Sequence, residues 1–365
     1  MKIPYVNLPL QWKNEKKRLM KIIEKTLSKG EYVNPYSLET KIFEKKVSKL
    51  CGTKYAVALS SGTDALTLGL YLLGVKKGDE VITPPNSFIS STSVITHIGA
   101  KPVFVDVLDD QNINPDLIES AITKKTKAIM PVHLTGRICE MKKIKSISEK
   151  YNIPIIEDAA QSIGSKYYGK PAGSFGQIGC FSTHPLKNLN AIGDGGFLTT
   201  NDKNIFNKAK TFSNHGLANR NLVKHFSFLS RMDVIQSAVL NFRLQNLKYI
   251  ISARRKNAEF YLKNLNRARY FFKNEKPYEF NTYHTFVIQT KDRDKVANYL
   301  KKNNIGTAIH YPIPLHLQPA AKYLGYKKGD FPKTEKQSKE ILTIPIHQYL
   351  TKKELRKVVD TLNKI

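Results

Sequence analysis

Cysteine is scarce in this 365-residue sequence, which contains only Cys51, Cys139 and Cys180. The three cysteines are odd in number and show no CxxC spacing, so we predict neither a disulfide framework nor a zinc site, and no other metal site. Reduced thiols of this kind are typical of cytoplasmic proteins.

Long hydrophobic runs are also missing. No apolar stretch approaches the roughly 20 residues that a membrane-spanning helix needs. The first 25 residues place Lys13, Lys16, Lys17 and Arg18 among their apolar positions, so they lack the uninterrupted core of a signal peptide. We therefore expect a cytoplasmic protein with no membrane partner.

Acidic residues are few. The chain has 30 aspartates and glutamates and 59 lysines and arginines, which gives a formal net charge of +29. Such an excess indicates attraction to nucleic acid, anionic lipid or a phosphate-bearing substrate. A general bias toward lysine is the alternative, since the positive residues are spread along the chain without a run of five. A nucleic-acid-binding regulator stays a competing hypothesis, but no helix-turn-helix or RNA-binding motif supports it, and we expect no nucleic-acid partner.

The common glycine-rich phosphate motifs are absent. No GxxxxGK[ST] occurs, and the glycines of 173–179 have the wrong spacing for a dinucleotide site. The segment Ser60–Asp64 (SSGTD) instead lies between an apolar run, Tyr55–Leu59, and an apolar helical stretch, Ala65–Leu73. Free amides and the helix dipole favour a phosphate at such a helix start. A plain N-cap by Thr63 or Asp64 is the alternative interpretation.

Strands and helices alternate through the first two thirds of the chain. The predicted strands cover residues 55–59, 79–83, 101–106, 127–133, 153–158, 178–181 and 197–200. This rhythm predicts an α/β fold with a largely parallel sheet and ligands at the carboxyl ends of its strands. A surface loop is expected over 214–228. A long helical stretch, Arg231–Leu265, leads to a smaller α+β part with a strand at 306–311. We expect a large domain over 1–240 and a small domain over 241–365.

One lysine lies in a segment rich in turn residues, GCFSTHPLKNLNAIGDGG (179–196). Ser182 and Thr183 end the strand that precedes it, and Lys187 follows between a proline and several glycines. A lysine just past a buried strand can serve as an amine nucleophile. An ordinary solvated lysine is the alternative, since most loop lysines are solvated.

An aspartate follows another predicted strand. Asp158 ends the largely apolar run 153–158, where a carboxylate is costly without a cationic partner. Capping the next helix is its alternative role. The predicted phosphate cup at Ser60–Asp64, together with Phe88, Asp158, Ser182 and Lys187, makes the set that pyridoxal 5'-phosphate requires. This set is a lysine for the imine, a carboxylate for the ring nitrogen, and donors for the phosphate.

Many segments, in order, support a resemblance over nearly the whole chain. They are SSGTDAL (60–66), GDEVITPPNSF (78–88), PVFVDV (102–107), IMPVHLTG (129–136), IEDAAQSIG (156–164), GCFSTHPLKNLNAIGDGG (179–196), NHG (214–216), SRMDVIQSAVL (230–240) and IHYPIPLHLQPA (309–320). With these the sequence resembles the DegT/StrS-type nucleotide-sugar aminotransferase family. The resemblance implies the fold-type I aminotransferase architecture: a large domain with a mainly parallel seven-stranded sheet flanked by helices, and a smaller C-terminal α+β domain.

The resemblance also implies roles for matching residues. Lys187 would form the imine with pyridoxal phosphate and move the proton, and Asp158 would pair with the ring nitrogen. The implied cofactor contacts are Gly62, Thr63, Phe88, Gln161 and Ser182. The implied substrate contacts are His184, Arg231, His310, Tyr311 and His316. For His310 and His316, a structural histidine with satisfied hydrogen bonds is the alternative.

The implied reaction is amino transfer from glutamate to a keto-deoxysugar nucleotide, for bacterial surface polysaccharide or glycan biosynthesis. The segment 309–320 favours a 3-keto over a 4-keto sugar. Related sugar dehydratases carry histidine at the imine position, whereas this chain has Lys187.

A homodimer with its active site at the subunit interface is also implied. One departure weakens this point: Leu229 stands where the family usually has an asparagine that reaches the cofactor phosphate of the neighbouring subunit. Leucine cannot donate a hydrogen bond.

Overall fold

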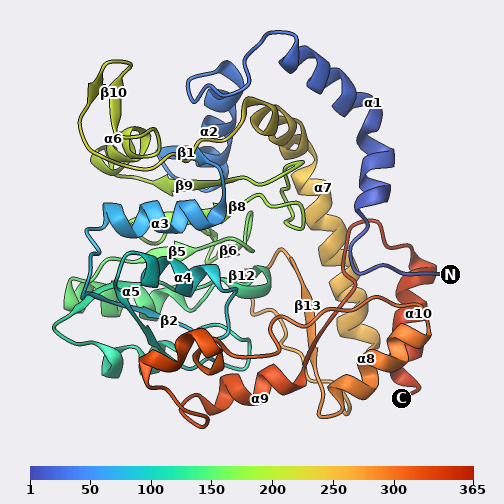
Figure 1. Ribbon diagram of the computed structural model, residues 1–365. Helices are drawn as coiled ribbons and strands as arrows, with labels where there is room; N and C mark the ends of the chain where they lie inside the picture. The colour runs from blue at the N-terminus through green and yellow to red at the C-terminus, as the bar shows by residue number, and fades with distance from the viewer.

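A seven-stranded sheet forms the centre of the larger part of the molecule (Figure 1). The computed structural model describes residues 1–365. The strands of the sheet are β1 (Tyr55–Leu59), β2 (Glu80–Thr83), β3 (Lys101–Phe104), β4 (Thr126–Ile129), β5 (Ile156–Asp158), β8 (Ile178–Ser182) and β9 (Gly196–Thr200). They match the seven predicted strands, with ends that differ by a few residues.

The strand order is β3-β2-β4-β5-β8-β9-β1. Hydrogen bonds define one group, β3-β2-β4, and another, β5-β8-β9-β1. The parallel bridges Ile129–Ile155 and Val132–Asp158 join the two groups. Only β9 runs antiparallel, to both β8 and β1. The predicted α/β fold with a mainly parallel seven-stranded sheet is confirmed.

Helices cover both faces of this sheet (Figure 1). They are α2 (Leu38–Leu50), α3 (Gly62–Leu72), α4 (Ser90–His97), α5 (Met141–Tyr151), α6 (Lys203–Phe212) and the first half of α7 (Val234–Asn264). Side chains of β1 alternate between two cores: Ala56 and Ala58 pack on the side of α2, α5 and α7, while Val57 and Leu59 pack on the side of α3, α4 and α6. This burial on both faces explains why β1 is a continuous apolar run.

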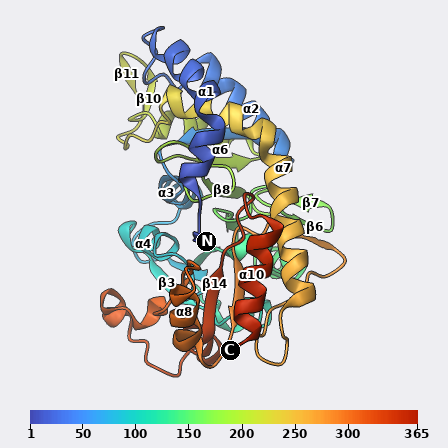
Figure 2. The ribbon, with the colours of Figure 1, turned by 90° about the vertical axis from the view of Figure 1, so that its right-hand side faces the viewer.

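A third core lies in the smaller part of the molecule. It is formed by β13 (Phe286–Gln289), β14 (Ile341–Ile344), α8 (Arg293–Lys302), α10 (Lys352–Asn363) and the end of α7. The N-terminal segment joins it, because Ile3 is buried in this core and forms a parallel bridge with Ile305. Figures 1 and 2 both show the N-terminus near α10. The domain division between residues 240 and 241 stays a prediction.

The remaining elements lie around these cores. They are α1 (Leu8–Leu27), α9 (Pro332–Glu340), the hairpin β10 (Leu217–Asn219) and β11 (Leu222–Val223), and a small sheet of β6 (Lys166–Tyr167), β7 (Lys170–Pro171) and β12 (Glu279–Phe280). No helix of the chain is both long enough and apolar enough to cross a membrane.

Two local predictions were wrong. The strand expected over 306–311 is absent, because its residues pair with two different segments. Gly306 N donates to Ile3 O, and only Ala308 pairs with Thr343. The surface loop expected over 214–228 contains the hairpin β10–β11.

Candidate functional site

The carboxyl ends of β1, β5 and β8 border a cavity of about 430 Å³, a volume typical of ligand pockets. Ten of the twelve predicted site residues line it, although they come from distant parts of the sequence. They are Gly62, Thr63, Phe88, Asp158, Gln161, Ser182, His184, Lys187, His310 and Tyr311. Parallel strands place their carboxyl ends at one edge of a sheet, which explains why these residues meet.

The start of α3 forms the floor of the predicted phosphate cup. Ser61 is the N-cap, since its side chain accepts a hydrogen bond of 3.0 Å from Asp64 N; neither Thr63 nor Asp64 caps the helix. The first amides of a helix have no partner within it, so those of Gly62 and Thr63 are available to an anion. A Cβ on residue 62 would lie 2.7 Å from Ser182 Cβ, so only glycine fits here.

Asp158 ends β5 with 5% of its surface exposed. Its Oδ2 accepts a hydrogen bond of 2.7 Å from Ser91 Oγ, and its Oδ1 accepts one of 3.2 Å from Ala160 N. No lysine, arginine or histidine of the chain forms an ion pair with it. A buried carboxylate without a cation is therefore free to pair with a protonated ring nitrogen.

Lys187 is partly buried on the loop between β8 and β9. Loss of water around its ammonium group lowers its pKa to about 8, although the charge of Asp158 partly opposes this shift. A lysine with a pKa near 8 keeps a usable fraction of neutral amine close to neutral pH.

Neutral aromatic and polar side chains complete the lining of the cavity. The rings of Phe88 and Tyr311 lie 6.0 Å apart, centroid to centroid. His310 Nδ1 is 2.9 Å from Thr343 Oγ1, and burial together with the charge of Lys187 lowers the His310 pKa to about 4. Gln161 Oε1 accepts a hydrogen bond of 2.8 Å from Thr135 N. The donor set fits pyridoxal phosphate: neutral groups for its phosphate, an aromatic face, a carboxylate and an amine.

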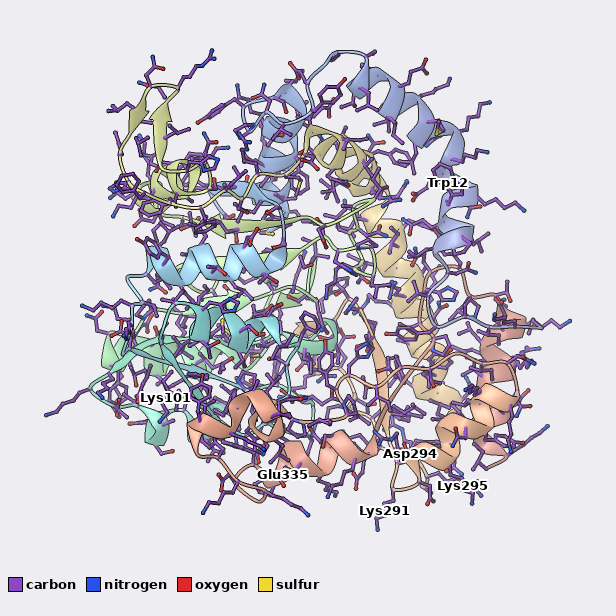
Figure 3. All side chains as sticks on the ribbon, in the orientation of Figure 1. Trp12, Lys101, Lys291, Asp294, Lys295 and Glu335 are labelled. Atoms are coloured by element: carbon purple, nitrogen blue, oxygen red, sulfur yellow. The ribbon has the colours of Figure 1, made fainter.

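Two predicted substrate residues lie outside the cavity lining. His316 is 2% exposed, its Nε2 is 3.1 Å from Glu335 Oε1, and its ring packs on Phe331. Figure 3 labels Glu335 on α9. These contacts hold the ring inside the protein, although its buried Nδ1 has no hydrogen-bond partner, and the substrate contact of His316 stays a prediction. Arg231 Nη1 donates to Asn214 Oδ1 at 3.2 Å, and its substrate contact stays a prediction.

Leu229, which stands where the family usually has asparagine, lies two residues before Arg231. Leu229 is 46% exposed and forms an antiparallel bridge with Asn214. The leucine side chain offers no donor to a neighbouring copy, and Asn214 accepts from Arg231 through its Oδ1.

Several lining residues were not predicted from the sequence. They are Tyr5, Ser90, Asp194, Arg254, His284 and His347, among others. Two of them, His284 and His347, are histidines, a residue type common in active sites, but no motif around either one marks it. Arg254 lies in the middle of α7 and Tyr5 near the N-terminus, where no local pattern marks them.

Comparison with known proteins agrees with this geometry. Residues 13–363 match the model of the DegT/DnrJ/EryC1/StrS aminotransferase family. A transaminase of Aneurinibacillus thermoaerophilus, named for dTDP-3-amino-3,6-dideoxy-alpha-D-galactopyranose, is 37% identical over 99% of this chain and 99% of its own. A "pleiotropic regulatory protein" of Geobacillus stearothermophilus is 35% identical over 99% of this chain and 98% of its own.

Solved structures show the same fold. DesV of S. venezuelae superposes with a TM-score of 0.95 at 32% identity, covering 100% of this chain and 98% of its own. The putative sugar aminotransferase Spr1654 of Streptococcus pneumoniae, in its PMP form, superposes with a TM-score of 0.90 at 28% identity, covering 95% and 94%. The family match over nearly the whole sequence confirms the resemblance: this chain belongs to the DegT/DnrJ/EryC1/StrS aminotransferase family.

Proposed function

We propose that this enzyme transfers an amino group from glutamate to a 3-keto-deoxysugar nucleotide. The observation that carries the proposal is one cavity lined by Lys187, Asp158 and the start of α3. The 3-keto position is supported by the transaminase of A. thermoaerophilus, whose name places the amino group on carbon 3. A 4-keto sugar nucleotide is the alternative substrate.

Pyridoxal 5'-phosphate, the cofactor of this enzyme, supplies an aldehyde that carries the amino group between two substrates and a ring that takes up electrons. In our assignment Gly62, Thr63 and Ser182 bind its phosphate, and Phe88 lies against its ring. Asp158 keeps the ring nitrogen protonated. Lys187 Nζ accepts and returns the proton in both halves of the reaction, because its pKa of about 8 suits proton transfer near neutral pH.

We also propose that two copies of the chain form the working enzyme. Exposed apolar side chains on the loop that carries Lys187 support this, since Leu186 is 45% and Ile192 42% exposed in the single chain. Clustered exposed apolar residues mark interaction surfaces. A cytoplasmic location is supported by three buried, unpaired cysteines and stays a prediction.

The test is a panel of 3-keto and 4-keto sugar nucleotides incubated with the enzyme, pyridoxal phosphate and glutamate, with products identified by mass. We expect an amino sugar nucleotide from a 3-keto substrate. Product from 4-keto substrates alone would reject the position, and no product from any substrate would reject the reaction.

A nucleic-acid-binding role is the second candidate, motivated by the +29 charge and by the name of the G. stearothermophilus relative. Binding of duplex DNA that survives physiological salt would favour it, because weak nonspecific binding is lost as salt rises.

A further inference from the structure

A buried arginine without an anionic partner lines the same cavity as Lys187. Arg254, on α7, is 6% exposed. Its Nη1 donates to the carbonyl oxygens of Tyr283 at 3.2 Å and His284 at 3.0 Å, while its buried Nε has no partner. The ion pairs of the chain do not include Arg254.

This arrangement is costly for the protein alone. A buried guanidinium loses its hydration, and two carbonyl oxygens replace only part of it. Burial lowers the pKa of Arg254 to about 10, and the groups whose charge would oppose that shift are the phenols of Tyr5 and Tyr349, not carboxylates. An anion entering the cavity would supply the missing partner.

Neutral donors lie beside this charge. Tyr5 lines the cavity, and burial raises its pKa to about 12, so its hydroxyl keeps its proton. His284 also lines the cavity, its Nδ1 is buried without a partner, and burial lowers the pKa of the ring. A neutral imidazole can donate one N–H without adding charge. A carboxylate could therefore meet a guanidinium, a hydroxyl and an imidazole.

The position of Arg254 relative to Lys187 indicates which anion binds in the cavity. Both residues line the main cavity and also a small side cavity next to it, and the charges of both act on His284. In an amino-acid donor, the α-carboxylate is one bond from the carbon that reacts near Lys187 Nζ. In a sugar nucleotide, the phosphates are several atoms from the reacting keto carbon.

We propose that Arg254, assisted by Tyr5 and His284, binds the α-carboxylate of the amino-acid donor. The proposal rests on the proposed function and adds the residue that recognises the donor. An arginine suits this task because its planar N–H groups match a carboxylate.

The test separates the two halves of the reaction in the holoenzyme. The first half is followed by the spectral change that glutamate causes in the pyridoxal form, and the second by product from the pyridoxamine form and a keto-sugar nucleotide. We expect Arg254→Gln to raise the KM for glutamate by about 100-fold, since removing one member of a buried charged contact is costly. The second half should change by less than about threefold, because no sugar contact is lost.

Arg255→Gln is the matched control. Arg255 is the next residue of α7, its Nη1 is 2.7 Å from Glu275 Oε1, and it lies outside the cavity. Its KM for glutamate should match the wild type. An unchanged KM in Arg254→Gln, or equal losses in both halves together with a lower Tm, would overturn the proposal.

A binding measurement makes the test independent of turnover. Glutarate has two carboxylates and no amine, so it should raise the Tm of the wild-type holoenzyme, as a ligand of the native state does, but not that of Arg254→Gln. Arg254→Lys should recover part of the shift. If Arg254→Gln does not fold, absence of a glutarate shift in the wild type overturns the proposal. Failure to aminate any sugar, with the glutamate half-reaction intact, would instead reject the proposed acceptor.

Discussion

Lys187 is the residue whose removal should affect the chemistry most. We expect Lys187→Ala to lose the visible absorbance that borohydride bleaches, and to lower amino transfer by about 10³-fold, because no other amine lines the cavity. Absorbance spectra and product formation measure the two effects. Lys295→Ala, at an exposed position on α8 labelled in Figure 3, should behave like the wild type. Near-normal turnover by Lys187→Ala would contradict the assignment.

The acidity of Lys187 predicts a pH dependence. Burial lowers its pKa to about 8, and only the neutral amine accepts a proton. Amination of the keto sugar by the pyridoxamine form should therefore increase as pH rises through about 8 and level off above it. Single-turnover rates between pH 6 and 10 would measure this. A rate that falls over that range, in a holoenzyme that stays folded, is the contrary outcome.

His316 should matter for stability and not for substrate affinity. Its hydrogen bond to Glu335 and its packing on Phe331 are buried, so His316→Ala should lower the free energy of unfolding by about 1–3 kcal/mol. Urea denaturation measures the loss, and the KM for the sugar nucleotide should stay unchanged at a temperature where the variant is folded. A raised KM with wild-type stability would instead support the substrate role that the resemblance implies.

At the level of elements, β5 is fixed by a buried glutamate next to Asp158. Glu157 is fully buried and accepts hydrogen bonds from the amides of Gly173, Phe175 and Gly176. His133 Nε2 lies 3.0 Å from Glu157 Oε2. Because His133 Nδ1 accepts a hydrogen bond from Cys139 N, the ring carries its proton on Nε2 and donates a hydrogen bond to Glu157. This network ties β5 to the loop before β8, and so supports the strand end that presents Asp158.

Neutralising that glutamate should weaken the whole fold. We expect Glu157→Gln to lower the free energy of unfolding by about 3 kcal/mol, because an amide can accept from fewer of these donors and its NH₂ would face some of them. Thermal unfolding of both proteins measures the loss. Glu259→Gln, which removes an exposed pair with Lys263 on α7, is the control and should leave the free energy of unfolding close to that of the wild type. Equal stability of both variants would contradict the interpretation.

For the whole molecule, the oligomeric state is the main open prediction. Light scattering should give twice the 41.5 kDa mass of the chain. Ile192→Glu places a charge on the exposed apolar loop that carries Lys187 and should shift the enzyme toward monomer, because a charge buried without a partner in the interface is unfavourable. Tyr323→Glu, at a 70% exposed position in the smaller part, should leave the mass unchanged. A wild-type monomer at micromolar concentration would reject the dimer.

The sequence alone determined the family, the fold and the cofactor, and comparison confirmed them. This was possible because their determinants are local: a continuous apolar run marks a doubly covered strand, and the residue after it faces the edge where ligands bind. Asp158 ends such a run, and Gly62 and Lys187 each follow one within five residues, which is why all three could be predicted from the sequence.

Only the tertiary structure decided which further side chains complete the cavity. Tyr5 reaches it because Ile3 pairs with Ile305, and Arg254 reaches it because α7 continues past the sheet into the smaller part. It also distinguished His310, which lines the cavity, from His316, which contacts Glu335, although only five residues lie between them. Contacts between distant segments depend on packing of the entire chain, and no local pattern of residues records them.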